Sequence, residues 1–228
     1  MRRNWISFVA GALALSALPV AAQKMVPTGG GQVVIITGPP GSGKSLQAGK
    51  LGKKYKVPVI SLSKLVQDGT NNHEKVAGAA AAALASGEML ADDAAIQLLS
   101  ARINQPDAGR GFILDGYPIS EAQARYLDQF VINNKLQTPK VVVLEAADDV
   151  TRARLLKRKR ADDSAENIDR RLKEYHHEEA FLNSWYKPAN TVRVDATLPP
   201  EQVFARMEEG LIEIFRKKEF KGRAPAAK

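Results

Sequence analysis

Five short runs of apolar, mostly β-branched residues recur along the chain, and a longer amphipathic stretch follows each of them. Such runs are typical of strands buried on both faces, and the longer stretches are typical of helices. The expected strands are 33–37, 59–61, 112–114, 141–144 and 192–194. The alternation predicts an α/β fold of three layers, with a five-stranded parallel sheet flanked by helices on both faces.

Helices are expected between and after these strands, at 46–55, 62–102, 120–133, 148–160, 165–186 and 200–217. The long stretch 62–102 is expected to break near Asp68 and Gly69 and again at Gly87, because glycine weakens a helix interior. Its segment Val76–Ala85 is rich in alanine, and we expect it to form a small packed helix.

The beginning of the chain has a different character. Two arginines precede an apolar run, Trp5–Leu18, and small residues follow up to Ala22. This is the layout of a secretory signal peptide, and the run is short for a membrane span. We therefore expect residues 1–22 to be a signal peptide and the protein to be exported, to the periplasm or outside the cell. The alternatives are an uncleaved membrane anchor, or a cytoplasmic protein that starts at Met25.

Composition narrows the classes of protein. Apolar residues make up 44% of the 228 residues, which suffices for the core of one domain, expected at 32–217 after a linker at 23–31. The absence of cysteine excludes disulfides and thiolate metal sites. The net charge of +8 suits polyphosphate ligands but does not imply nucleic acid or membrane. The basic tail 218–228 is expected to be disordered.

A glycine-rich loop carries the strongest functional signal. Residues 38–45 fit the pattern G-x-x-x-x-G-K-[S/T] and lie between a predicted strand and a predicted helix. Glycines let backbone N–H groups surround phosphate oxygens, the lysine adds charge at the β and γ phosphates, and the last hydroxyl is a ligand for Mg²⁺. The loop therefore predicts binding of a nucleoside triphosphate by Gly38, Gly41, Ser42, Gly43, Lys44 and Ser45.

Two further features suit phosphate chemistry. Asp115 ends a predicted strand, where a carboxylate for Mg²⁺ is expected in nucleotide-binding α/β proteins. Arg154 and Arg158 are four residues apart and so share a helix face, and Arg160 and Arg171 follow. Arginines near a γ phosphate would stabilise phosphoryl transfer, although a solvated basic face explains their spacing equally well.

From residue 32 to the last predicted helix, the chain resembles adenylate kinase and its nucleoside monophosphate kinase relatives. The resemblance implies two small mobile parts on the domain, one at about 61–90 that closes over a monophosphate and a lid at about 158–163 over ATP. The lid is shorter than in short-lid members of the family. The matching segments are Gly38–Ser45, Val59–Ser61, Gly111–Pro118, Gln123, Arg154–Arg158, Asp162, Asp163, Arg171, Leu172 and Glu174–His176.

The resemblance implies a donor side in which every part is present. Lys44 would hold the ATP phosphates, and three arginines would surround the transferring phosphoryl group. A further arginine, Arg154, would lie against the ATP base, and Asp115 would organise Mg²⁺ and its waters. The residues expected to be catalytic are Lys44, Arg158, Arg160 and Arg171.

The acceptor side departs from the family pattern. Gln123 resembles the glutamine that reads the edge of the acceptor base, and Leu90 falls where backbone meets that base. Gln67 and Ile119, however, stand where the family has arginines that hold the monophosphate, and Lys64 partly substitutes for them. Two lost charged hydrogen bonds of about 1.5–3 kcal/mol each would weaken acceptor binding by roughly two to four orders of magnitude.

Two functions are consistent with this pattern. The first is an ATP-dependent nucleoside monophosphate kinase, a monomer with Mg²⁺ as cofactor and AMP or a related monophosphate as acceptor. The second is an exported nucleotide-binding pseudokinase or weak NTPase that has lost the acceptor phosphate site. Neither calls for a nucleic acid partner, nor for a membrane beyond an uncleaved signal peptide.

Overall fold

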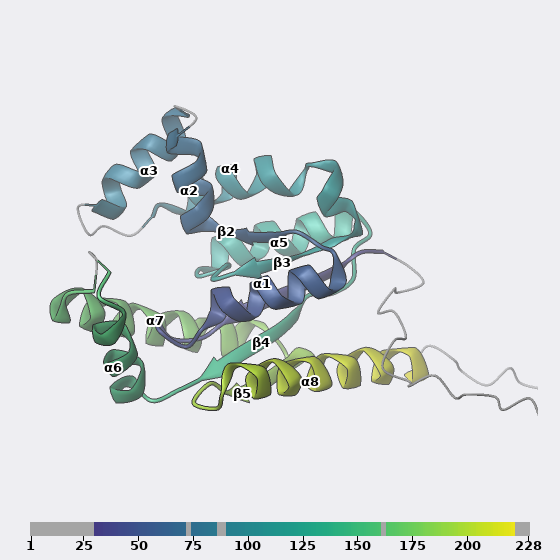
Figure 1. Ribbon diagram of the computed structural model, residues 1–228. Helices are drawn as coiled ribbons and strands as arrows, with labels where there is room; N and C mark the ends of the chain where they lie inside the picture. The colour runs from purple at the N-terminus through teal and green to yellow at the C-terminus, as the bar shows by residue number, and fades with distance from the viewer. Residues whose placement is uncertain (1–29, 72–73, 86–89, 161–162, 222–228) are drawn as a thin grey trace, which may run out of the picture.

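A parallel five-stranded sheet of order β2-β3-β1-β4-β5 forms the centre of the computed structural model, which describes residues 30–71, 74–85, 90–160 and 163–221 (Figure 1). Each strand contains the predicted run and extends it by at most one residue at either end. The strands are β1 (Gln32–Thr37), β2 (Val59–Ser61), β3 (Gly111–Asp115), β4 (Lys140–Glu145) and β5 (Thr191–Asp195).

Alternate residues of the strands pack into hydrophobic cores on opposite faces of the sheet. In β1, Val33 and Ile35 pack into one core cluster, while Val34 and Ile36 pack into the other. The first cluster is covered by α4 (Asp92–Ile103), α5 (Glu121–Asn133) and α7 (Ala165–Trp185). The second is covered by α1 (Lys44–Tyr55) and α8 (Pro200–Lys221). The three-layer α/β fold is therefore confirmed.

The predicted helix 62–102 is three helices, α2 (Leu62–Asn71), α3 (Lys75–Ala85) and α4. The break expected near Asp68 and Gly69 lies slightly later, because α2 continues through both residues to Asn71 and α3 begins at Lys75. A Cβ at Gly69 would lie 2.5 Å from the Ala77 Cβ, so this glycine allows close approach of α3 instead of ending a helix. The second expected break, at Gly87, lies outside the described residues.

The connection after α6 (Asp148–Arg158) is short, since α7 begins at Ala165. Lys159 adopts a left-handed conformation with φ 55° at the end of α6, and Ser164 caps α7 by accepting a hydrogen bond from Asn167 N at 3.2 Å. Leu155 of α6 packs with Ile168 and Leu172 of α7 in a small separate hydrophobic cluster. The part expected to be a lid is thus only the link 159–164 between two packed helices, of which 161–162 lie outside the described residues.

The two ends of the described chain can be compared with the predicted signal peptide and the predicted basic tail. α8 reaches Lys221, four residues beyond the predicted end of the last helix at Lys217. The expected signal peptide, 1–22, and residues 222–228 lie outside the described residues. Within the described ranges, no helix combines the length and apolar character that crossing a membrane requires.

Candidate active site

The glycine-rich loop joins β1 to α1 at the carboxyl edge of the sheet. Gly41 and Gly43 have φ of 86° and 93°, a left-handed region that side chains rarely adopt. A Cβ at Gly41 would also lie 2.9 Å from the Thr151 carbonyl oxygen of α6, so glycine is required there for close approach as well. The Ser42 Oγ is buried without a hydrogen-bond partner in the described part of the chain, which suits a phosphate oxygen as its partner.

Lys44, the first residue of α1, has its ammonium folded back onto the loop. Its Nζ donates to the carbonyl oxygens of Gly38 at 2.6 Å and Pro39 at 3.1 Å. These two carbonyl oxygens provide acceptors for the buried ammonium. A triphosphate in the loop would require Lys44 to exchange these carbonyl oxygens for phosphate oxygens.

Charged groups of both signs surround Lys44. Burial lowers the pKa of its ammonium, and the carboxylates of Asp115 and Glu178 act in the opposite direction. The guanidinium groups of Arg171 and Arg158 lower the Lys44 pKa further. Two carboxylates and two guanidinium groups, from β3, α6 and α7, therefore converge on the lysine of the loop.

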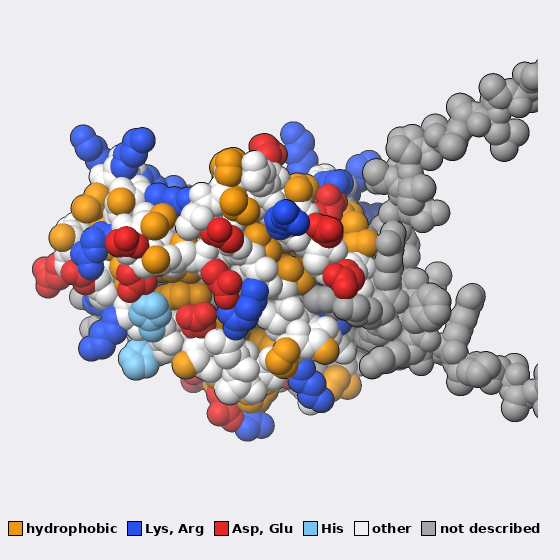
Figure 2. Space-filling view, turned by 90° about the horizontal axis from the view of Figure 1, so that it is seen from below, with side chains coloured by type: hydrophobic (Ala, Val, Ile, Leu, Met, Phe, Trp, Pro, Cys, Tyr) orange, Lys and Arg blue, Asp and Glu red, His pale blue; other side chains and the backbone are white. Residues whose placement is uncertain are grey.

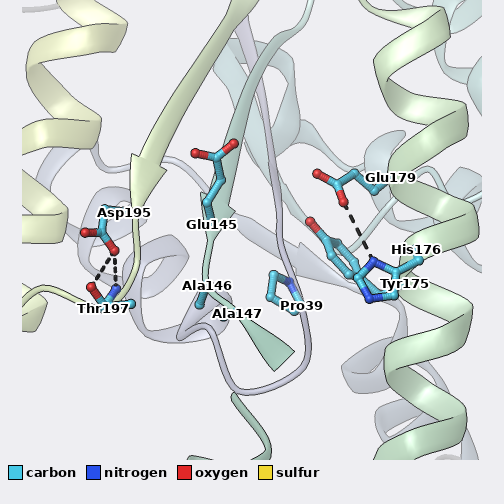
Figure 3. Close-up of a pocket in the computed structure, with 9 residues that line it drawn as sticks. All are labelled: Pro39, Glu145, Ala146, Ala147, Tyr175, His176, Glu179, Asp195 and Thr197. Carbon is cyan, nitrogen blue, oxygen red and sulfur yellow. Dashed lines mark hydrogen bonds and ion pairs between the residues drawn. The ribbon is translucent and has the colours of Figure 1, made fainter. Parts of the chain in front are cut away.

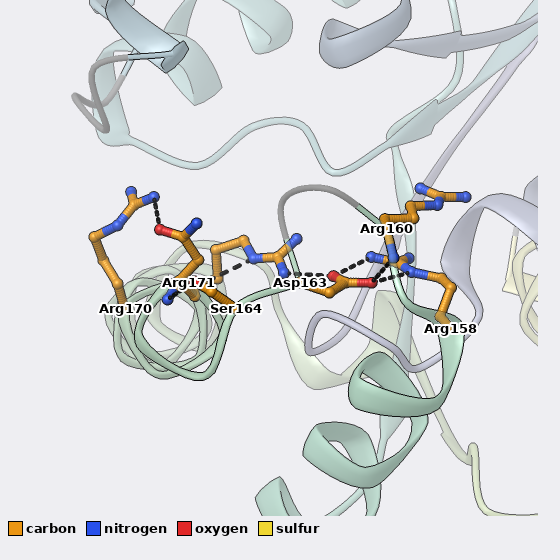
Figure 4. A network of polar contacts seen from close by, with 7 residues as sticks. Arg158, Arg160, Asp163, Ser164, Arg170 and Arg171 are labelled. Atoms are coloured by element: carbon orange, nitrogen blue, oxygen red, sulfur yellow. Dashed lines mark hydrogen bonds and ion pairs between the residues drawn. The ribbon is translucent and has the colours of Figure 1, made fainter.

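The Asp163 carboxylate holds the arginine cluster together (Figure 4). Arg158 donates to it through Nε at 2.8 Å and Nη2 at 2.8 Å, and Arg171 donates through Nη2 at 2.8 Å. The backbone N–H of Arg160 donates to the same carboxylate at 3.1 Å. The Asp163 side chain is 0% exposed, and the hydrogen bonds from Arg158 and then Arg171 hold its pKa well below the ordinary range.

Two residues expected to bind Mg²⁺, Ser45 and Asp115, come from α1 and β3. Asp115 ends β3 beside Ile36 of β1 and is 8% exposed, and Ser45 is an exposed residue in the first turn of α1. Carboxylate and hydroxyl oxygens are the donor types that Mg²⁺ takes in proteins, so these two residues fit the metal.

Arg154 ties α6 to the loop after β5. Its Nη1 donates to the Ala196 carbonyl oxygen at 2.8 Å and its Nη2 to that of Thr197 at 3.4 Å. The side chain is half-buried and held at both ends of its guanidinium group. Its expected contact with the ATP base stays a prediction.

Gln123, the glutamine expected to bind the acceptor base, is buried, and its side-chain amide forms hydrogen bonds with other residues of the protein. The Gln123 Nε2 donates to Asp92 Oδ1 at 2.8 Å, and its Oε1 accepts from the backbone N–H of Ile119 at 3.0 Å. Ser120 Oγ also donates to Asp92 Oδ1, at 2.7 Å. A base at this position would have to replace one of these partners of Gln123.

The other acceptor-side residues are spread out. The Lys64 side chain is 71% exposed and lies 3.9 Å from Asp68, one turn along α2. Gln67 is exposed and Ile119 is half-buried. Leu90 packs against both the sheet core and the cluster between α2, α3 and α4, so its side chain has a structural role. The structure does not gather these residues into one charged site.

A pocket of about 430 Å³ lies on the α7 side of the loop (Figure 3). Its walls combine apolar and acidic residues, and Figure 2 shows acidic side chains gathered near histidines on the face seen from below. Glu145 and Glu179 both pair with Arg193, at 2.6 and 3.8 Å. The lining residues are Pro39, Glu145, Ala146, Ala147, Tyr175, His176, Glu179, Asp195 and Thr197.

Three residues that organise the site have no role in the sequence-based prediction. Asp163 lies in a segment that matches the family, so its signal was available. Asp92 is visible only as an acidic residue in the first turn of α4. Glu178 sits among other charged residues of an amphipathic helix, and nothing in the sequence distinguishes it.

A strand, glycine-rich loop and helix that present a lysine beside clustered arginines define the class of P-loop nucleotide-binding proteins. Comparisons with known proteins narrow the class. A model of the adenylate kinase family matches residues 36–191. Adenylate kinases of Brucella ovis, Brucella canis and Brucella suis are each 33% identical over 190 residues, which span 78% of this chain and 98% of each relative. The chain belongs to the adenylate kinase family, whose members are phosphotransferases with a phosphate group as acceptor.

Replacing Asp163 tests its role in holding the arginine cluster. We expect Asp163→Asn to lower the free energy of unfolding at pH 7 by about 1–3 kcal/mol, because two guanidinium groups lose their counter-charge. This range is reduced because the Arg158 side chain is 33% exposed. As a control, Asp169→Asn on α7 removes an exposed pair with Arg152 and should cost less than about 1 kcal/mol.

Urea unfolding followed by far-UV circular dichroism measures both losses. Since the folded pKa of Asp163 is depressed, its contribution is present above the ordinary value of 3.8 and falls away as the pH drops below it. Equal losses in the two variants at pH 7 would contradict the central position of Asp163.

Proposed function

We propose that the protein is an ATP-dependent nucleoside monophosphate kinase that transfers the γ phosphoryl group of ATP to AMP or a related monophosphate. The observation that carries the proposal is the convergence of Lys44, Arg158 and Arg171 beside the glycine-rich loop. Phosphoryl transfer requires positive charge placed around the migrating group and little covalent chemistry. A protein that only bound nucleotide would have no need of this complete set of cations.

In this proposal Lys44 leaves the carbonyl oxygens of Gly38 and Pro39 and binds the phosphates of ATP. Arg158 and Arg171, with Arg160 beside them, move from Asp163 toward the transferring group. An oxygen of the acceptor phosphate attacks the γ phosphorus in line, and the bond to the β–γ bridging oxygen breaks to release ADP. No covalent enzyme intermediate forms.

The remaining residues position the two nucleotides. Arg154 would lie against the ATP base, while Gln123, Leu90 and Lys64 would contact the acceptor. Mg²⁺, held through Ser45 and Asp115, would neutralise charge on the phosphates when bound. Ser42 would donate its buried hydroxyl to a phosphate oxygen.

The proposal predicts that a monophosphate stimulates ADP formation from ATP. Wild-type protein and Lys44→Ala are compared with ATP and Mg²⁺, alone and with AMP, CMP, GMP or UMP. At least one monophosphate should raise the rate of the wild type above the variant, because Lys44 stabilises the transition state. If none does so, the kinase activity is excluded.

Hydrolysis of ATP is the second candidate function, and the acceptor side favours it. Gln67 is exposed, Ile119 carries no charge, and the Gln123 amide is engaged by protein groups. In that case the protein would bind ATP and release phosphate slowly to water. Phosphate release that is independent of every monophosphate distinguishes this function from the kinase.

Restoring two arginines tests the acceptor site directly. In the double variant Gln67→Arg and Ile119→Arg, the KM for the monophosphate should fall by roughly two orders of magnitude or more, because each new charged hydrogen bond contributes about 1.5–3 kcal/mol. The KM for ATP should stay within about twofold of the wild type. An unchanged acceptor KM would show that these positions do not face the acceptor phosphate.

We also propose that the protein is exported after cleavage at Ala22 and acts as a monomer. The apolar run near the amino terminus supports export. Amino-terminal sequencing of the protein from its native cell should give Gln23 as the first residue, and an intact Met1 would exclude cleavage.

The proposed monomer is tested by light scattering, where a mass equal to that of a dimer would exclude it.

A further inference from the structure

The pocket of about 430 Å³ beside the glycine-rich loop has no role in the proposed reaction (Figure 3). The carboxyl ends of β4 and β5 form one wall, and α7 forms the other. Pro39, Ala146 and Ala147 give the pocket an apolar surface, which the phenol ring of Tyr175 extends. A cavity that combines apolar surface with a few polar groups is the common form of a small-molecule site.

The Tyr175 hydroxyl is the first sign of a ligand. The residue is 6% exposed, and Figure 3 shows its hydroxyl directed into the space between the two walls. No hydrogen bond joins this hydroxyl to another residue in the ranges that the structure describes. Burial, and next the Glu179 carboxylate, raise the pKa of Tyr175, so the hydroxyl stays neutral. Since buried polar groups normally have a partner, this hydroxyl indicates a ligand that hydrogen-bonds to it in the pocket.

The charged groups on the two walls are mainly carboxylates. Glu145 and Glu179 share one guanidinium group, with Arg193 Nη1 at 2.6 and 3.8 Å from them. Asp195 is a third carboxylate, and its hydrogen bonds come from neutral donors, the N–H and the hydroxyl of Thr197, at 2.7 and 2.6 Å. The pocket therefore has an excess of negative charge, which favours a cation as its ligand and disfavours a phosphate.

The positions of these carboxylates define the shape of a complementary cation. Glu179 lies on α7, whereas Glu145 and Asp195 end the two strands of the facing wall. His176, which also lines the α7 wall, pairs with Asp148 at 3.0 Å. A ligand with an ammonium group at each end of a methylene chain would reach carboxylates on both walls. Its methylene groups would lie against the apolar surface of the pocket.

We propose that this pocket binds an aliphatic diamine or a longer polyamine. One ammonium group would donate hydrogen bonds to the Glu179 carboxylate and the Tyr175 oxygen on α7. The other would reach the carboxylates at the ends of β4 and β5. The inference is independent of the proposed kinase activity, because no side chain that lines the pocket takes part in phosphoryl transfer.

Calorimetry on the nucleotide-free protein, at pH 7 and physiological ionic strength to screen weak surface attraction, tests the proposal with cadaverine, a chain of methylene groups with an ammonium at each end. The wild type should bind one equivalent. Tyr175→Phe should weaken binding about fivefold, because one hydrogen bond is lost, and Glu179→Gln about tenfold, because a charged one is lost. The Tm of Tyr175→Phe should stay within about 1 °C of the wild type, since its hydroxyl has no partner in the described protein.

Glu174→Gln is the matched control. Glu174 and Glu179 lie on the same helix and their side chains are both 29% exposed, but Glu174 pairs with Arg170 and does not line the pocket. This variant should bind cadaverine like the wild type.

Ligand controls separate a diamine from other ligands. Pentanediol, the uncharged chain of the same length, should not bind, and acetyl-lysine amide, which stands for a protein lysine and has one ammonium group, should bind at least about fivefold more weakly than cadaverine. Equal affinities for cadaverine and acetyl-lysine amide would overturn the inference, as would displacement of cadaverine by an equal concentration of Mg²⁺. Failure of the wild type to bind cadaverine, or unchanged binding in both Tyr175→Phe and Glu179→Gln, would overturn it as well.

Discussion

Repulsion between like charges is the constraint on which the site depends. A phosphoryl-transfer site gathers cations, whose mutual repulsion must be balanced by negative charge. Asp163 supplies it for Arg158 and Arg171, and the carboxylates of Asp115 and Glu178 favour the charged form of Lys44. The carbonyl oxygens of Gly38 and Pro39 accept hydrogen bonds from the Lys44 ammonium. A triphosphate at the loop would have to compete with these partners for the same cations.

The parallel sheet explains why residues so far apart in the sequence meet. The carboxyl ends of β1 and β3 lie side by side in register, which brings the glycine-rich loop next to Asp115. α6 packs on the loop at Gly41, and the short link 159–164 returns the chain directly into α7. Helices α6 and α7 and the link between them therefore bring Arg158, Asp163 and Arg171 together. The acceptor side depends on α2, α3 and α4 and receives no comparable set of cations among the described residues.

Much of this arrangement could be predicted from the sequence. The strands were visible because residues buried on both faces must be apolar, and the loop was visible because phosphate binding imposes glycine, lysine and serine at fixed spacing. Gly69 misled the prediction, since a glycine that ends a helix and one that allows close packing of two helices look the same. Asp92 could not be found, because an aspartate in the first turn of a helix gains its partners Ser120 and Gln123 only in the folded chain.

The central claim is that the donor half of the site is complete and the acceptor half is deficient. Thermal unfolding with each nucleotide alone tests it most directly. A non-hydrolysable ATP analogue with Mg²⁺, at about one hundred times its Kd, should raise the Tm by about 5–10 °C, because binding adds about 2.7 kcal/mol to the folded state. AMP at the same concentration should raise the Tm by less than about 1 °C. An equal rise with AMP, or no rise with the ATP analogue, would contradict the account.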